Sequence, residues 1–136
     1  MPLLTLHMNY DSDQVAGDLA RGLSELTAQI LRKDPAKIVV RIVTDGAQAS
    51  WYANATRITD GSAIVSLSIL VTKGTNSELE KSQWIDAAWR LLSERLGPLQ
   101  GSNYISVVEI DAMSWGYDGI TQHRRSKETN TAKELV

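Results

Sequence analysis

The chain contains no cysteine among its 136 residues. This absence excludes disulfide bonds and thiolate chemistry, and it fits the reducing cytoplasm, where we expect the protein to reside. No stretch approaches the roughly 18 uninterrupted apolar residues that a transmembrane helix needs. The first basic side chain is Arg21, so we expect no signal peptide. These absences predict a soluble protein without a membrane partner.

Positive charge is not in excess either. The sequence has 14 lysine and arginine residues against 16 aspartate and glutamate residues, a formal net charge of -2. This balance argues against a nucleic-acid partner. His7 and His123 belong to no cluster at metal-ligand spacing, and the sequence has no glycine-rich phosphate loop and no Ser-His-Asp signature. We therefore expect no metal and no cofactor.

The apolar pattern contains the same series of elements twice, in a length that suits one domain. Each series begins with a strand of alternating apolar residues, continues with a helix of 3.6-residue periodicity, and returns in a strand that is followed by a turn. The first unit spans about 1–60 and the second about 61–121. The remaining residues, 122–136, are polar and aperiodic, which indicates either disorder or an arm on a neighbouring subunit.

The spacing of two tryptophans supports a duplication. Trp51 and Trp115 follow the last strand of their units and stand 64 positions apart. Asp11 and Thr75, the predicted N-caps of the two helices, have the same separation. Because β-α-β crossovers are right-handed, two such units predict an α/β fold with both helices on one face of a single sheet.

Pro2 stands at the head of the first strand. A strand tolerates proline at its first residue, where a missing N–H breaks no ladder, so Pro2 needs no further role. If Met1 is removed, however, Pro2 becomes a free secondary amine. The residues alone leave both interpretations open.

The doubled unit, the "MPLL" at 1–4 and the "WGYDG" at 115–119 together resemble the tautomerase superfamily. The stretch from "AIVSLSILVTKG" to "LGPL" is similar to 5-carboxymethyl-2-hydroxymuconate isomerase. The "MPLL" with Trp115 and Tyr117 is similar to malonate semialdehyde decarboxylase. The resemblance covers the chain to about Gly119, and it implies a tautomerase-like sandwich, a homotrimer with active sites near subunit boundaries, and a small carboxylate substrate.

The resemblance also implies a role for Pro2 as a general base. An α-amine has an ordinary pKa of roughly 8, which burial and a neighbouring cation lower. Such a base suits keto–enol isomerisation of a small unsaturated 2-oxo or 2-hydroxy acid. The second unit has no equivalent amine, because Ser66 stands 64 positions after Pro2. We expect one catalytic centre per chain.

The remaining candidates are cations and aromatic residues. Many superfamily members carry an arginine before each helix, where this chain has Asp11 and Thr75. We therefore expect other residues to act in catalysis beside Pro2 and to bind the substrate. Each of these candidates also has an ordinary structural explanation, as a solvated charge or as a packed aromatic ring. The catalytic candidates are Lys73, Arg41 and Tyr104, and the substrate-binding candidates are Arg57, Trp115 and Tyr117.

Two other functions remain open. On the same scaffold, a protonated Pro2 acts as a general acid in decarboxylation, hydration or dehalogenation of a three-carbon acid. That chemistry needs a carboxylate near the amine, for which Asp11, Asp45 and Glu109 are candidates. The third interpretation is a non-catalytic trimeric module that has lost the cations of its relatives.

Overall fold

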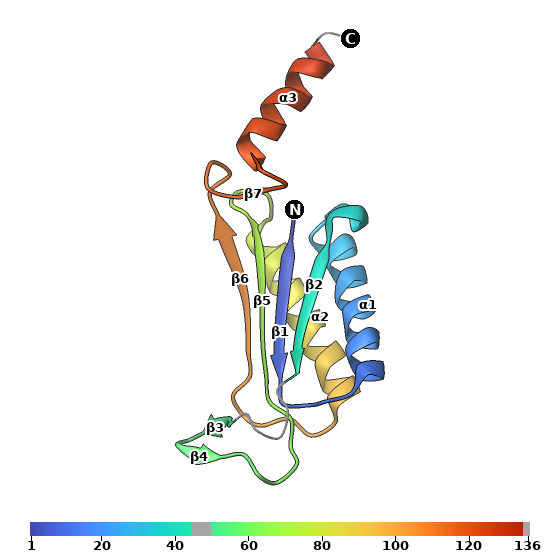
Figure 1. Ribbon diagram of the computed structural model, residues 1–136, viewed down its shortest axis with the longest axis vertical. Helices are drawn as coiled ribbons and strands as arrows, with labels where there is room; N and C mark the ends of the chain where they lie inside the picture. Colours follow the sequence, from blue (N-terminus) through green and yellow to red (C-terminus); the bar gives the residue numbers. More distant parts are fainter. Residues whose placement is uncertain (45–49, 135–136) are drawn as a thin grey trace.

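The computed structural model describes residues 1–44 and 50–134, with side chains through residue 128. Its centre is a four-stranded sheet in the order β2-β1-β5-β6 (Figure 1). β1 pairs with β2 in parallel, β5 pairs with β6 in parallel, and β1 and β5 run antiparallel. The two β-α-β units are therefore related by an approximate twofold rotation. Their bounds are β1 (Leu3–Met8), α1 (Asp13–Ile30) and β2 (Val39–Thr44), then β5 (Val65–Thr72), α2 (Glu78–Leu96) and β6 (Tyr104–Ile110).

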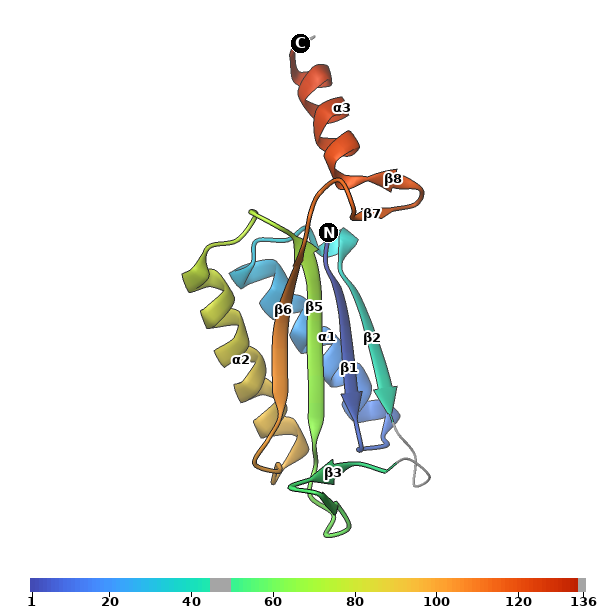
Figure 2. The same ribbon diagram turned by 90° about the vertical axis from the view of Figure 1, so that its left-hand side faces the viewer.

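Both helices cover the same face of the sheet, which confirms the predicted α/β class (Figure 2). Alternate residues of β1 and β5, such as Leu4 and Ile69, are fully buried against them. Trp84 of α2 is also fully buried, and its Nε1 donates a hydrogen bond of 3.1 Å to Oγ1 of Thr27. The opposite face of the sheet carries Thr5, Ser68 and their neighbours, and within one chain no described helix covers it.

The predicted helix caps are wrong by one or two residues. The N-cap of α1 is Ser12, whose side chain accepts from the backbone N–H of Val15. The N-cap of α2 is Ser77, which forms a capping box with Glu80. Thr75 instead donates from its hydroxyl to the carbonyl of Thr72. Several capping residues stand side by side before each helix, and the packing of the first turn chooses among them.

A small hairpin closes each unit, where the sequence predicts a turn after the returning strand. The first consists of β3 (Tyr52–Ala53) and β4 (Thr56–Arg57), and the second of β7 (Gly116–Tyr117) and β8 (Ile120–Thr121). Each two-residue turn has positive φ at both positions, which is the type I′ geometry that suits the twist of hairpins. The two hairpins lie at opposite ends of the sheet, and the second lies beside the N-terminus (Figure 1).

The predicted aperiodic tail forms a helix instead, α3 (Gln122–Glu134). It begins directly after β8 and projects away from the sandwich (Figures 1 and 2). Its sequence has no apolar stripe, which is why hydrophobic periodicity missed it. Among the described residues, none of the helices combines the length and the apolar character that crossing a membrane requires.

Candidate active site

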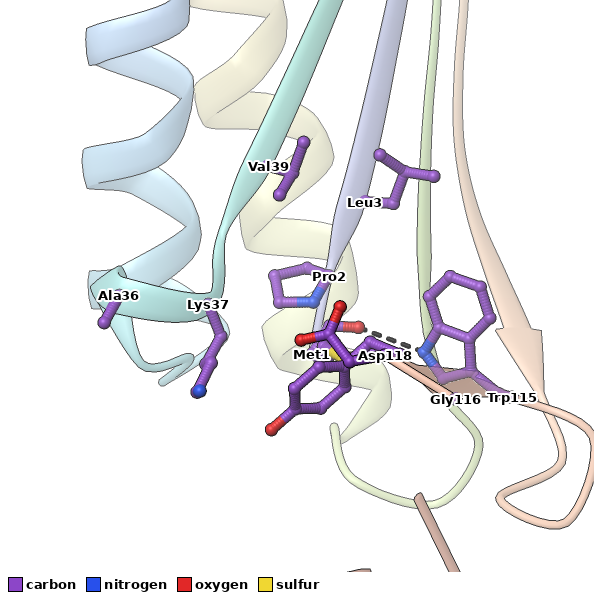
Figure 3. A pocket seen from close by; sticks show the side chains of 10 residues that line it. Met1, Pro2, Leu3, Ala36, Lys37, Val39, Trp115, Gly116 and Asp118 are labelled. Carbon is purple, nitrogen blue, oxygen red and sulfur yellow. Dashed lines mark hydrogen bonds between the residues drawn. The ribbon is translucent and has the colours of Figure 1, made fainter. Parts of the chain in front are cut away.

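A pocket of about 460 Å³ opens at the start of β1 (Figure 3). Three segments that are distant in sequence meet there. Met1 and Pro2 come from the N-terminus, Lys37 from the 3₁₀ turn η1 (Pro35–Lys37) that precedes β2, and residues 115–118 from the second hairpin. The parallel register of β1 and β2, which sets Leu3 opposite Val39, brings the first two segments together.

Pro2 is buried in this pocket and is held through the backbone. The N–H of Val39 donates to the carbonyl of Pro2 at 3.3 Å. The indole Nε1 of Trp115 donates to the carbonyl oxygen of Met1 at 3.0 Å (Figure 3). Because that carbonyl is bonded to the nitrogen of Pro2, the indole N–H is directed at the space immediately beside this nitrogen.

The two strands of the hairpin can pair so closely because Gly116 stands between its two aromatic residues. A Cβ at Gly116 would collide with the backbone of Ile120 and Thr121. Tyr117 is in turn fixed by cations: the guanidinium of Arg125 lies 3.6 Å from the ring centroid and donates to the Tyr117 carbonyl at 2.8 Å. Such cation–π contacts orient an aromatic ring without covering its edge.

The electrostatic surroundings favour a neutral amine. The pKa of the amino group of Met1 is lowered from its ordinary value, first by burial and then by the positive charge of Lys33, while Asp34 opposes the shift. Lys33 is itself half-buried, and its pKa is lowered by burial and by the neighbouring Arg32. Its Nζ donates to Oγ1 of Thr75 at 2.9 Å. The cation that lowers the pKa of the amine is therefore held in place.

The pocket also contains a lysine that the sequence did not single out. Lys37 lines it, and its Nζ lies 5.1 Å from the ring centroid of Tyr117. Asp118, in the turn of the second hairpin, adds a carboxylate to the lining (Figure 3). Lys33, Lys37 and Asp118 were all missed. From sequence alone, the Asp34-Pro35 pair indicates only the end of the preceding helix. A lysine two residues after this proline, directly before a strand, is the signal that could have identified Lys37.

Among the predicted site residues, Pro2, Trp115 and Tyr117 lie together in the pocket. Lys73 lies at the same end of the sheet, because β5 ends where β1 begins, but it is exposed and outside the pocket lining. Its charge acts on Glu109, whose pKa is lowered mainly by a hydrogen bond of 2.8 Å from Lys81.

The other three predicted residues lie elsewhere in the chain. Arg41 is exposed in the middle of β2, on the uncovered face of the sheet. Arg57 belongs to the first hairpin, and Tyr104 pairs with Ser66 at the start of β5, so both lie at the end opposite Pro2. Asp11 also lies at that end, and Asp45 is outside the described residues.

Metal ligands do not gather in the described part of the chain, where no group of three or more His, Cys, Asp or Glu residues is suited to hold an ion.

Two tandem β-α-β units with a pocket at the amino end of the first strand define a tautomerase-like protein. The family model of macrophage migration inhibitory factor (MIF) matches residues 1–123, and the chain belongs to this family, within the tautomerase superfamily.

Solved structures share this fold. The crystal structure of Pt0534 inactivated by 2-oxo-3-pentynoate has a TM-score of 0.79 and 14% sequence identity, with 90% of this chain and 98% of that chain covered. The F6 fused 4-OT asymmetric trimer has a TM-score of 0.76, 13% identity and coverage of 90% and 98%. Macrophage migration inhibitory factor from Trichinella spiralis has a TM-score of 0.64, 24% identity and coverage of 88% and 98%. No curated protein sequence matches the chain. These similarities show the fold, and they do not single out the isomerase or decarboxylase that the sequence resembles.

Proposed function

We propose that the protein is a cofactor-independent tautomerase in which Pro2, freed by removal of Met1, acts as the general base. The observation that carries this proposal is the burial of Pro2 in a pocket that also holds a lysine and two aromatic residues. The substrate class is a small unsaturated 2-oxo or 2-hydroxy acid. Removal of Met1 moves the free amine by one residue, to the Pro2 nitrogen.

The surroundings favour a base over an acid. Burial and the charge of Lys33 lower the pKa of the amino group of Met1, and we expect the same two causes to act on the Pro2 nitrogen once Met1 is removed. A neutral proline nitrogen takes the proton of the substrate's 2-hydroxyl group and returns it to a carbon of the conjugated chain. No atom is gained or lost, so the reaction needs no co-reactant.

Substrate binding is assigned to Lys37 and Trp115. The ammonium group of Lys37 pairs with the substrate carboxylate. The Nε1 of Trp115 donates to the carbonyl of Met1, and after removal of Met1 the substrate's 2-oxygen takes the place of that acceptor. Because this donor lies beside the base, it stabilises charge that develops on the oxygen as the proton moves.

We further propose that the chain forms a homotrimer. The fused 4-OT proteins with the same fold are trimers. The uncovered sheet face bears exposed Val39 and Val108, and both edge strands, β2 and β6, lack a neighbour among the described residues. Arg41 lies in the middle of β2, outside the lining of the pocket, so we expect it to serve a site only through an adjacent subunit.

One observation favours a second candidate function, hydration of an unsaturated three-carbon acid. Asp118 adds a carboxylate to the pocket, and the charge of Asp34 opposes the lowered pKa of the amine. In this reaction Asp118 takes a proton from water, the resulting hydroxide bonds to the β-carbon, and protonated Pro2 supplies the proton for the α-carbon. The two functions require opposite protonation states of Pro2.

The test compares the natural protein with Pro2→Ala and with a form whose N-terminus is extended by residues that are not removed. Intact-mass spectrometry first establishes whether Met1 is absent. Ultraviolet assays with 2-hydroxy-2,4-dienoic acids follow ketonisation, and 2-oxo-3-pentynoate, which inactivates Pt0534, serves as a covalent probe. We expect activity and labelling of Pro2 in the natural protein only. Retained Met1, or equal activity in the extended form, would overturn the role of Pro2.

The protonation state of Pro2 distinguishes the tautomerase from the hydratase. An NMR titration of the Pro2 nitrogen in ¹⁵N-proline-labelled protein measures its pKa without any substrate. A pKa at or below neutrality supports the tautomerase, whereas an amine that stays protonated at neutral pH, together with turnover of a three-carbon acid, supports the hydratase.

A further inference from the structure

A second pocket, of about 440 Å³, lies at the opposite end of the sheet. It is built from the same parts as the pocket at Pro2. The start of β5 takes the place of the start of β1, the start of β6 takes that of β2, and the first hairpin takes that of the second. Ser66 and Tyr104, a register pair, line it as Leu3 and Val39 line the first pocket.

The hairpins close in the same way at both pockets. The N–H of Ile58 donates to the carbonyl of Trp51 at 2.9 Å, and the N–H of Gln122 donates to that of Trp115 at 2.7 Å. Both donors and both acceptors are 64 positions apart, like the tryptophans themselves. The second pocket is thus the twofold counterpart of the candidate active site.

The two pockets differ in the charge of the residues that line them. The strand register places Val65 at the position of Pro2, one residue before the register pair, and not Ser66 as the 64-residue spacing predicts. The backbone nitrogen of Val65 is an amide in the middle of the chain rather than a terminal amine. Ser102 takes the position of Lys37, two residues before the register pair, and Asn54 takes that of Asp118 in the hairpin turn. The charged groups of the first pocket are thereby replaced, one by one, with neutral groups of hydrogen-bonding or apolar character.

The second pocket also has more aromatic residues in its lining than the first. Tyr52 is 62% exposed and Tyr104 is 70% exposed, and both line the second pocket together with Trp51. Their rings offer stacking surfaces to a planar molecule, and Ser66, Ser102 and Asn54 offer hydrogen-bond donors and acceptors. A ligand carboxylate has no positively charged side chain to pair with among the described residues of one chain that line this pocket.

We propose that this second pocket is a separate, non-catalytic binding site for a small, uncharged, planar molecule that carries a carbonyl or hydroxyl group. The two pockets of one chain then sort ligands of similar size by charge: anionic carboxylates bind beside Pro2, and neutral compounds bind between β5 and the first hairpin. The proposal is independent of the reaction at Pro2, because it requires only the geometry and the charges of the second pocket.

The experiment uses benzamide and benzoate, which have nearly the same shape and differ in charge. The indole ¹H–¹⁵N resonances of Trp51 and Trp115, assigned with Trp51→Phe and Trp115→Phe, report on the two pockets separately. We expect benzamide to shift the Trp51 resonance saturably and benzoate to shift it at least tenfold more weakly. Tyr52→Ala should weaken benzamide binding about fivefold through the loss of one stacking surface.

A gain-of-function variant keeps the test decisive if Tyr52→Ala disturbs the hairpin. Ser102→Lys introduces the cation of the first pocket, and it should reverse the preference in favour of benzoate without changing the response of Trp115. The proposal is overturned if millimolar benzamide leaves the Trp51 resonance unchanged, if both ligands move it equally, or if Ser102→Lys does not improve benzoate binding. None of these readouts depends on turnover at Pro2.

Discussion

Lys33 and Thr75 join the two β-α-β units beside the N-terminus. The Nζ of Lys33, which follows α1, donates a hydrogen bond of 2.9 Å to Oγ1 of Thr75, which precedes α2. The same hydroxyl donates to the carbonyl of Thr72 at 2.6 Å, so its own orientation is fixed. Because Lys33 lowers the pKa of the N-terminal amine, this contact connects the second unit to the electrostatics of the first pocket.

The first prediction concerns this contact. Lys33→Ala removes a like charge from the neighbourhood of the amine, so the pKa of Pro2 should rise. A base must be unprotonated to act, and the ascending limb of kcat/KM against pH should therefore move to higher pH. Thr75→Val, which keeps the shape and loses the acceptor, should produce a smaller shift in the same direction. Thr75→Ser is the matched control and should behave like the natural protein. Superimposable pH profiles for all four proteins would refute the role of Lys33.

The second prediction separates two lysines at the same end of the sheet. Lys37 lines the pocket and Lys73 does not. If Lys37 binds the substrate carboxylate, Lys37→Ala should raise KM about tenfold, in keeping with the loss of a charge-assisted hydrogen bond. Lys73→Ala, which removes the same charge outside the pocket, should change KM less than twofold. The reverse result would assign the carboxylate to Lys73, as the comparison with arginine-bearing relatives suggests from sequence alone.

The third prediction concerns two glycines of α1. A Cβ at Gly17 meets no heavy atom within 4 Å, whereas one at Gly22 would lie 2.8 Å from Cδ2 of Leu91 in α2. Alanine favours a helix over glycine by about 1 kcal/mol, so Gly17→Ala should stabilise the protein by roughly that amount. Gly22→Ala should gain less or lose stability, because Leu91 must leave its position. Urea unfolding at one fixed protein concentration measures both, and equal stabilisation would show that the helices have room to adjust.

The sequence predicted the elements well because their signals are local. Alternation in β1 and β5 and helical periodicity in α1 and α2 each depend on residues that are close together in the sequence. The pairing of Pro2 with Trp115 and Tyr117 followed from the family resemblance and not from any local pattern. Lys37 and Asp118 were missed because their proximity depends on the parallel register of β1 with β2 and on a hairpin more than a hundred residues away from Pro2.

The fourth prediction concerns Glu80, the anionic partner at the junction of α1 and α2. Its Oε2 accepts from Nε of Arg32 at 2.6 Å, and its Oε1 accepts from the backbone N–H of Ser77 at 2.9 Å. The hydrogen bond from Arg32, followed by that from Ser77, lowers the pKa of Glu80 from 4.5 to about 2. A carboxyl whose pKa is lower in the folded chain stabilises the fold above its ordinary pKa, and this contribution is lost as the pH falls from about 4.5 to about 2.

The variant Glu80→Gln tests this dependence of stability on pH. Glutamine still offers an oxygen to the N–H of Ser77, so the cap is preserved while the charge is removed. The Tm of the natural protein should therefore exceed that of the variant above pH 4.5, and the difference should shrink towards zero as the pH approaches 2. Glu78→Gln removes a carboxylate from the same first turn and serves as the control for the general effect of charge at the helix start. A Tm difference for Glu80→Gln that stays constant over this pH range would mean that the carboxylate contributes through shape alone and that Arg32 does not lower its pKa.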